Sequence, residues 1–319
     1  MSLEHVVSGR LVKPIRVLLY GLEGVGKSTF AAGAPNPIFL GAEDGTSELD
    51  VERFPQPQTW PEVIEAVDEL RTAEHDYKTL VIDTLDWVEP LCWAHLCATW
   101  TPDGRKTKVK NIEDYGFGKG YNEAGGLWRV LISRLERLRE QRRMDMVLLA
   151  HSWIRTFKNP MGGDYDRFEM KLHKIAAGIW REWCDAVVFA AHDITTYEDG
   201  RRIKGIGTGA RILHTQHNAV WDAKNRYDLP PSLPLDWNAF AEAVRTRRPD
   251  DPARLRTQIE RLLGEVAANT TLMTRDATLT TRVRNSVANA GDNADELARI
   301  LNKLAAKIET TPTDEEASQ

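Results

Sequence analysis

The residues with the clearest chemical signature form a glycine-rich segment near the start of the chain. Gly21-Leu-Glu-Gly-Val-Gly26-Lys27-Ser28 has two glycines on either side of four residues, followed directly by lysine and serine. In this pattern the glycines let backbone N–H groups curl around phosphate oxygens, the lysine reaches the β- and γ-phosphates, and the hydroxyl binds Mg²⁺. The spacing predicts a P-loop, with a chance glycine-rich turn as the alternative. The predicted nucleotide contacts are Gly21, Leu22, Glu23, Gly24, Val25, Gly26, Lys27, Ser28 and Thr29.

A P-loop also needs a second acidic group for the metal and its water shell. The apolar run Leu80–Asp83 ends in such a carboxylate. An apolar strand that ends in aspartate is the arrangement called Walker B, so Asp83 and the P-loop residue Ser28 are the predicted metal-site residues. The alternative is that Asp83 or Thr84 caps the helix that follows.

Two further acids, Glu43 and Asp44, come just after another apolar run, Ile38–Gly41. In an open α/β sheet, ligands bind beyond the carboxyl ends of the strands. Glu43 is therefore the candidate general base for activating water, and Asp44 is the second choice. Ordinary solvated loop acids are the alternative.

The order of these motifs resembles the RecA-like ATPase core, and more narrowly the phage-encoded, AAA-like ATP-binding proteins of single-strand annealing and recombination. The resemblance covers about residues 15 to 240. It rests on the P-loop, on the strand that ends at Asp83, and on a strand ending Leu148-Leu-Ala-His151-Ser152. The less generic segments that carry it are Ile112–Tyr121, Lys171–Lys174 and Arg181–Trp183.

The resemblance implies an α/β fold, a RecA-like P-loop NTPase core with a mostly parallel sheet between helices. It also implies ATP and Mg²⁺ as cofactors, single-stranded DNA as a partner, and a homo-oligomer, either ring or filament. The expected location is the cytoplasm, which for a phage-encoded protein is the cytoplasm of the bacterial host. ATP hydrolysis is expected to be slow and stimulated by DNA.

Individual residues acquire roles from the same resemblance. Glu43 corresponds to the glutamate that activates water. His151 corresponds to the polar residue that senses the γ-phosphate and relays its state to a DNA-binding loop; a satisfied histidine at a strand end is the alternative. Lys224 and Arg226 resemble a finger that reaches the γ-phosphate of the neighbouring subunit, where an exposed turn with solvated bases is the alternative. Lys27 completes the predicted catalytic set.

Two segments, residues 101–126 and 152–183, combine basic and aromatic side chains in what the sequence suggests are loops after core strands. Single-stranded DNA is typically bound by a basic track with aromatic platforms for the bases. Flexible surface loops with solvated charges are the alternative. The candidate DNA-binding residues are Arg105, Lys106, Lys108, Lys110, Lys119, Trp153, Arg155, Lys158, Arg167, Lys171 and Lys174.

The elements that must position these residues follow from apolar patterning. Short apolar runs alternate with helical patterns, which is typical of a mostly parallel α/β sheet. Asp199-Gly200 between two β-type runs predicts a hairpin near the end of the core. The predicted strands are Arg16–Tyr20, Ile38–Gly41, Leu80–Asp83, Met146–Ala150, Ala186–Ala190 and Arg211–His214; the predicted helices are Pro61–Glu74, Gly120–Arg142 and Asp236–Arg245.

The chain is expected to divide into an ATPase core over residues 1–245, a small helical appendage over 246–309 and an acidic disordered tail over 310–319. In the appendage, Asp251-Pro252 predicts a helix start, and apolar spacing predicts a last helix over Asn293–Glu309. Of the ten tryptophans, Trp128, Trp180 and Trp183 lie in helical patterns and are expected in the core.

Composition excludes several classes of protein. The chain has 319 residues, 42 basic and 47 acidic side chains and a net charge of −5, so any DNA binding must come from local patches. Three cysteines cannot form a disulfide framework. The apolar runs are far shorter than the roughly 20 residues of a membrane span, and the first residues lack the apolar region of a secretory signal.

Together these features predict an ATP-dependent single-stranded-DNA-binding protein that promotes annealing or homologous recombination, with ATP hydrolysed at subunit interfaces. A different class stays open: a nucleotide-gated loader that recruits a replication partner, or a single-strand-binding protein, through its C-terminal region without annealing DNA. A ring-shaped helicase or packaging motor ranks lower, because the chain carries no separate nuclease or primase region.

Overall fold

The computed structural model describes residues 13–43, 45–100, 109–199, 202–247, 252–268, 278–293, 296–297, 299–301 and 303–304, with side chains for all of these except 195–199, 202–205, 247 and 254. Two compact units are present. One spans Lys13–Val244, and the other contains the described residues from Arg245 onward. No described helix is long and apolar enough to cross a membrane.

The first unit is built on a sheet of ten strands among the described residues, in the order β10-β8-β7-β1-β5-β4-β2-β3, with β6 paired to β5 and β9 to β7. Pairing is parallel from β7 through β3, and antiparallel where β8, β10, β6 and β9 join. All six predicted strands are confirmed. The strands are β1 (Arg16–Gly21), β2 (Pro37–Gly41), β3 (Glu52–Arg53), β4 (Thr79–Asp83), β5 (Asp145–Phe157), β6 (Tyr165–Met170), β7 (Ala186–Asp199), β8 (Arg202–His214), β9 (Lys224–Asn225) and β10 (Ser232–Pro234).

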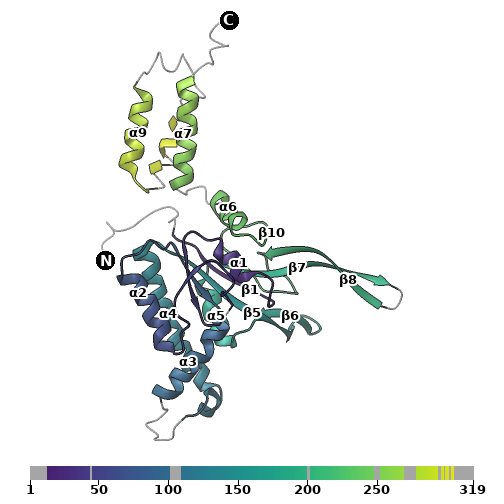
Figure 1. Ribbon diagram of the computed structural model, residues 1–319. Coiled ribbons are helices and arrows are strands. Elements are labelled where there is room, and N and C mark those ends of the chain that lie inside the picture. Colours follow the sequence, from purple (N-terminus) through teal and green to yellow (C-terminus); the bar gives the residue numbers. More distant parts are fainter. Residues whose placement is uncertain are drawn as a thin grey trace. The chain divides into compact units, whose positions relative to one another are not determined.

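Helices cover both faces of this sheet (Figure 1). One apolar core lies between the sheet and α2, α3, α4 and α5, and a second lies between the sheet and α1 and α6. Because both faces are covered, the central strands are continuous apolar runs rather than alternating ones. The helices are α1 (Lys27–Ala32), α2 (Trp60–Thr72), α3 (Leu85–Thr99), the 3₁₀ helix η3 (Ile112–Tyr115), α4 (Lys119–Arg142), α5 (Lys174–Trp183) and α6 (Trp237–Arg247).

A tryptophan cluster lies in the larger of these cores. Trp128 of α4 packs edge-on against Trp60 of α2, with ring centroids 5.2 Å apart, and against Trp180 of α5 at 5.4 Å. All three rings are buried. The predicted core positions of Trp128 and Trp180 are confirmed, and the cluster joins three helices that are far apart in the sequence.

The sheet's register brings the carboxyl ends of its parallel strands together. Gly21, the last residue of β1, lies opposite His151 of β5 and Ala190 of β7. Gly41 of β2 lies opposite Asp83 of β4. Since β5 lies between β1 and β4, His151 lies between the P-loop and Asp83.

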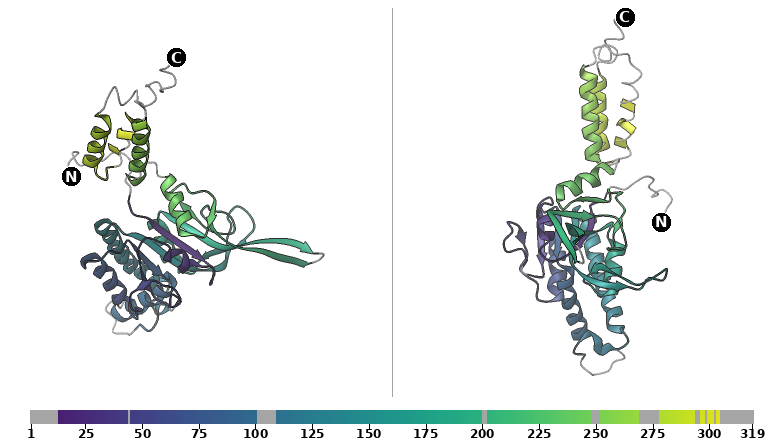
Figure 2. Two further views of the ribbon diagram at one scale, coloured as in Figure 1. Left: turned by 45° about the horizontal axis from the view of Figure 1, so that its top comes forward. Right: turned by 90° about the vertical axis from the view of Figure 1, so that its right-hand side faces the viewer.

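Two long hairpins extend from the sheet. Strand β5 continues past His151 to Phe157 and turns back as β6, with Ser152 opposite Met170 and Phe157 opposite Tyr165. Strands β7 and β8 pair out to Asp199 and Arg202, which confirms the predicted hairpin, and form the long two-stranded arm in the left view of Figure 2. The prediction of a loop directly after His151 is wrong, because a β-hairpin and helix α5 occupy residues 152–183.

The second unit is helical. Helices α7 (Pro252–Ala268) and α9 (Leu279–Ala290) pack with the described residues of the predicted last helix around an apolar core. That core contains Leu255, Ile259, Leu263, Leu297 and Ile300. Helix α9 was not predicted from the sequence. The predicted cap Asp251 and the acidic tail lie outside the described residues.

Candidate active site

A cavity of about 630 Å³ opens at the carboxyl edge of the parallel strands. The P-loop, the segment after β2, the end of β4 and His151 in the middle of β5 all contribute to its walls. It is lined by Gly24, Gly26, Lys27, Ser28, Thr29, Glu43, Gly45, Glu48, Leu49, Gln56, Asp83, Trp87, His151 and Arg211. The fold thus brings Glu43, Asp83 and His151 to the P-loop, as the strand-end rule predicts.

The P-loop has the backbone conformation that its glycines permit. Gly24 has φ of 71° and Gly26 has φ of 102°, in the left-handed region where a side chain is strained. Lys27 is buried, and its Nζ donates to the carbonyl oxygens of Gly21 at 3.3 Å and Leu22 at 3.0 Å. Burial lowers the pKa of the Lys27 ammonium, although nearby carboxylates, Asp83 foremost, oppose that shift. The loop is therefore a preformed cradle with one buried cation.

Ser28 and Asp83 meet directly, although they are far apart in the sequence. The Ser28 hydroxyl donates to Asp83 Oδ2 at 2.6 Å, while Asp83 Oδ1 is buried with no hydrogen-bond partner among the described residues. Burial raises the pKa of Asp83, since the carboxylate is only 1% exposed. A hydroxyl and a carboxylate with an unused oxygen are hard-cation ligands, so these two residues fit a Mg²⁺ ion.

His151 lies between two carboxylates: it is hydrogen-bonded to Asp86 and within ion-pair distance of Glu43, and both His151 and Glu43 line the cavity. The backbone N–H of His151 donates to Asp86 Oδ1 at 2.9 Å, and His151 Nδ1 lies 2.9 Å from Asp86 Oδ2. On its other side, His151 Nε2 lies 3.8 Å from Glu43 Oε1. Asp86 thus fixes the ring so that it faces Glu43.

The two carboxylates beside His151 have opposite electrostatics. Burial raises the pKa of Glu43, which makes it a stronger base once it is deprotonated. Burial would also raise the pKa of Asp86, but the hydrogen bonds from His151 outweigh it, so that pKa is lowered. Asp86 therefore holds His151 as an ionised acceptor, and Glu43 is suited to accept a proton from water.

A family model described as an AAA domain matches residues 13–227 of the chain. The chain belongs to this AAA domain family. Its P-loop, mostly parallel strand order and strand-end acids form an α/β P-loop NTPase fold with helices on both faces of the sheet. Among solved structures, the crystal structure of the RadB recombinase is similar with 9% identity over 71% of this chain and 90% of that chain, at a TM-score of 0.36. No curated protein sequence matches significantly.

Asp86 and Arg211 are residues of this AAA domain that no sequence pattern indicated. Asp86 lies three positions after Asp83, in the first turn of α3, where its pairing with His151 depends on the packing of α3 against β5. Arg211 begins the predicted strand Arg211–His214 and reaches the P-loop across the sheet. In both cases the role depends on a contact with a residue far away in the sequence, which the residue type alone does not predict.

A further buried acid in α3 of the AAA domain, Glu89, links the site to helix α5. It is 4% exposed, and both its oxygens accept from the backbone N–H of His173, the N-cap of α5, at 3.2 and 3.0 Å. Burial, together with repulsion from Asp86, raises the pKa of Glu89 to about 7.

This carboxyl makes stability depend on pH. Between the unfolded pKa of about 4.3 and the raised folded value, the native state keeps a proton that the unfolded chain has lost, so stability decreases as pH rises. Glu89→Gln removes that titration. The difference in free energy of unfolding between variant and parent should therefore be more favourable to the variant at pH 8 than at pH 5, by on the order of 1–3 kcal/mol. Urea unfolding at both pH values measures this, with the exposed Glu123→Gln as the control. An equal effect of Glu89→Gln at both pH values would contradict it.

The candidate DNA-binding residues of the first segment are only partly described. Arg105, Lys106 and Lys108 lie outside the described residues. The segment follows helix α3 rather than a strand, so its predicted position directly after a core strand is wrong. Lys110 and Lys119 are exposed, beside the fully exposed ring of Phe117.

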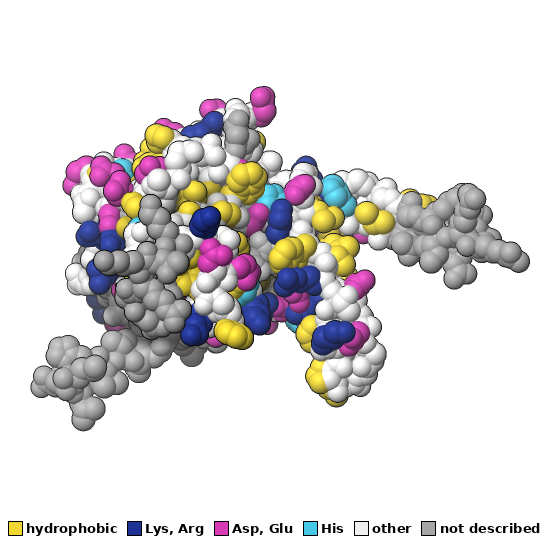
Figure 3. All heavy atoms as spheres, turned by 90° about the horizontal axis from the view of Figure 1, so that it is seen from below, with side chains coloured by type: hydrophobic (Ala, Val, Ile, Leu, Met, Phe, Trp, Pro, Cys, Tyr) yellow, Lys and Arg dark blue, Asp and Glu magenta, His cyan; other side chains and the backbone are white. Residues whose placement is uncertain are grey.

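The second segment of the AAA domain presents its candidates in order along a hairpin. Side chains alternate across a strand, so Trp153, Arg155 and Phe157 share one face of β5–β6 with Tyr165 and Arg167 opposite them. The guanidinium of Arg155 lies 4.1 Å from the Trp153 ring centroid, and that of Arg167 lies 4.2 Å from the Phe157 ring. In Figure 3, dark blue basic side chains lie beside yellow hydrophobic ones on the lobe below the arm. Lys158, Lys171 and Lys174 are exposed nearby in the chain.

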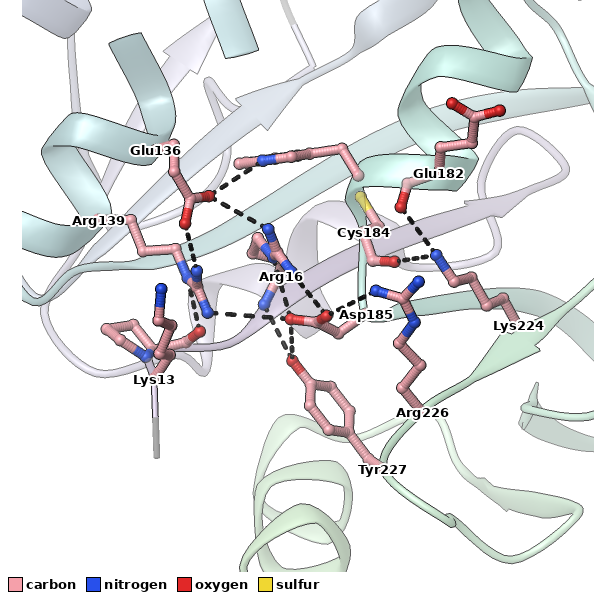
Figure 4. Close-up of polar contacts among 12 residues, drawn as sticks. Lys13, Arg16, Glu136, Arg139, Glu182, Cys184, Asp185, Lys224, Arg226 and Tyr227 are labelled. Atoms are coloured by element: carbon pink, nitrogen blue, oxygen red, sulfur yellow. Dashed lines mark hydrogen bonds and ion pairs between the residues drawn. The ribbon is translucent and has the colours of Figure 1, made fainter. Parts of the chain in front are cut away.

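Lys224 and Arg226 lie at the opposite edge of the sheet from their own P-loop. Strand β9 pairs with the start of β7, whereas the P-loop follows the end of β1. Lys224 Nζ donates to three backbone carbonyl oxygens at the end of α5, at 2.7 to 2.9 Å. Figure 4 shows two of these contacts, to Glu182 and Cys184. Arg226 pairs with Asp185 at 3.5 Å, within a network that includes Arg16 and Tyr227. Their role toward a neighbouring subunit stays a prediction.

Proposed function

We propose that this AAA domain protein binds single-stranded DNA in an ATP-dependent manner and promotes annealing or homologous recombination. One observation carries the proposal. Strand β5 holds His151 at the nucleotide cavity and continues without interruption into the hairpin that presents Trp153, Arg155 and Phe157. His151, which lines the cavity, is therefore only two residues from Trp153, the first residue of the proposed DNA surface.

The proposed reaction is hydrolysis of ATP. The oxygen of a water molecule bonds to the γ-phosphorus, the bond from that phosphorus to the β–γ bridging oxygen breaks, and ADP and phosphate result. Glu43 accepts the proton of the attacking water, and His151 holds Glu43 in position. Lys27 binds the β- and γ-phosphates. Ser28 and Asp83 would hold Mg²⁺, which neutralises phosphate charge when bound.

The hairpin supplies the features that single-strand binding requires. Arg155 is exposed and Trp153 is partly exposed on the same face, which offers a cation for the backbone beside a ring for a base. The net charge of −5 is an average over the whole chain. On the hairpin, Lys158 pairs with Asp164 and Arg167 pairs with Glu169, so Arg155 is the cation that this face offers to a phosphate.

The proposal also includes assembly into a homo-oligomer with ATP at subunit interfaces. In that arrangement Arg226, which is exposed, would be the trans finger, and Lys224 would have to leave three carbonyl acceptors to join it. Lys224 therefore fits better as a cap for the end of α5, where its positive charge interacts favourably with the negative end of the helix dipole.

Variants of the hairpin test the DNA surface. Trp153→Ala should weaken binding of an oligothymidylate, with Mg²⁺ and a non-hydrolysable ATP analogue present, by about 1–3 kcal/mol, roughly 5- to 150-fold, because a stacking platform is lost. Arg155→Ala should reduce the slope of log affinity against log salt concentration by about 0.7, the value for one phosphate contact on a single strand. Fluorescence anisotropy measures both.

Ile154→Ala is the matched control, because Ile154 is 61% exposed on the opposite face of the same strand. It should leave affinity and salt slope unchanged. Equal affinity of all three variants and the parent would contradict a DNA surface on this face. No DNA binding by any of them would favour the nucleotide-gated loader instead.

A further inference from the structure

Arg211 reaches the P-loop from a strand that the proposed mechanism does not use. In the sheet, Arg211 of β8 pairs with His192 of β7. This pair lies two positions beyond the Ala190–Leu213 pair, which flanks the end of β1. Arg211 shares a sheet face with the buried Leu213, two residues away, and Leu213 packs in the core beneath α1 together with Val25. The backbone therefore points Arg211 toward the loop that follows β1.

The side chain lies directly on the P-loop. Arg211 Nη1 donates to the carbonyl oxygen of Val25 at 3.4 Å, a long hydrogen bond. A Cβ on Gly26 would collide with the same nitrogen, so the glycine leaves room for the guanidinium as well as for its own φ of 102°. Among the described residues, no carboxylate lies within ion-pair distance of Arg211.

The charges that line the cavity show what this guanidinium can do. The basic side chains that line the cavity are Lys27 and Arg211, and the acidic ones are Glu43, Glu48 and Asp83. A bound triphosphate brings several negative charges and builds more on the γ-phosphate oxygens in the transition state. A planar guanidinium presents two parallel N–H groups that match two phosphate oxygens in a fixed geometry, whereas a lysine ammonium acts as a point charge.

We propose that Arg211 is a catalytic arginine supplied in cis: it exchanges the Val25 carbonyl for the phosphates of the nucleotide bound to its own chain and stabilises the charge that develops as the β–γ bridging bond breaks. This rests on the proposed ATP hydrolysis. It places one arginine of the site within the same chain, in addition to any residue from a neighbouring subunit.

Two variants and two readouts test the role. Arg211→Ala should lower kcat by about 10³-fold, the lower end of what such an arginine contributes, and Arg211→Lys should recover only part of that loss. The affinity for a fluorescent ATP analogue should decrease more than that for the matching ADP analogue. The control is Arg137→Ala, which removes an exposed arginine of α4.

Mixing subunits separates cis from trans action. Lys27→Ala subunits have an intact Arg211, and Arg211→Ala subunits have an intact Lys27. If Arg211 acted in trans, the mixture would regain hydrolysis at sites built from one subunit of each kind. A cis arginine predicts that the mixture hydrolyses ATP no faster than the sum of its parts, with mixed assembly verified by labelled subunits.

The outcomes distinguish this proposal from the one it rests on. A parent protein that neither binds nor hydrolyses ATP overturns the proposed function itself. A parent that hydrolyses ATP while Arg211→Ala matches it in kcat and in both affinities overturns only the role of Arg211. Recovery of activity in the mixture overturns the assignment in cis.

Discussion

Replacing Glu43 by glutamine is expected to lower the rate of ATP hydrolysis by about 10²–10⁴-fold, the contribution of a positioned general base. Glutamine keeps the shape and the contact with His151 but cannot accept a proton from water. Affinity for ATP should be nearly unchanged, because Lys27 and the P-loop backbone hold the phosphates. Steady-state hydrolysis measures kcat, and titration with a fluorescent ATP analogue measures affinity.

The pH profile adds a second readout of the same variant. Because burial raises the pKa of Glu43, the parent should lose activity, as pH falls, at a higher pH than an ordinary glutamate would cause. Glu43→Gln should lack this acid limb. Glu65→Gln, an exposed acid of α2, is the control and should resemble the parent. An unchanged kcat in Glu43→Gln would place the base elsewhere.

Trp128→Ala should have the largest effect on stability, lowering the free energy of unfolding by about 3–5 kcal/mol, the usual cost of truncating a buried tryptophan. The ring is 1% exposed and lies between Trp60 and Trp180. Its removal would leave a cavity where α2, α4 and α5 meet. Urea unfolding followed by circular dichroism measures the change.

Two companion variants keep this prediction testable even where alanine prevents folding. Trp128→Phe retains an apolar ring and removes an indole N–H that has no partner among the described residues, so it should cost clearly less than alanine. Val130→Ala on the same helix, at a side chain 48% exposed, should change stability little. Equal costs for all three would show that the cluster does not hold these helices together.

The sequence predicted well those features whose residues are close together in the chain. The P-loop is one continuous segment, and its flanking strand and helix follow from local patterns. The runs that lead to Asp83 and to His151 are short and apolar, of the kind that doubly covered sheets require. Parallel pairing then brings their ends together, so Glu43, Asp83 and His151 could be expected at one site.

Contacts between residues that are far apart in the chain could not be predicted from the sequence. Asp86 matters because α3 packs beside β5, and Arg211 because β8 lies two strands away from β1. The β5–β6 hairpin had a usable signal: Trp153, Arg155 and Phe157 alternate with Ile154 and Thr156, which is the period of a strand. Their basic and aromatic character suggested a loop instead, since an exposed hairpin has no apolar face to mark it.

The affinity of the parent protein for single-stranded DNA, with and without nucleotide, tests the central claim most directly. Coupling between cavity and hairpin predicts that Mg²⁺ and a non-hydrolysable ATP analogue tighten binding of an oligothymidylate by about 5–150-fold, the usual range for linked sites. Lys27→Ala should abolish that difference. Equal affinity of the parent with and without the nucleotide would contradict ATP-dependent DNA binding.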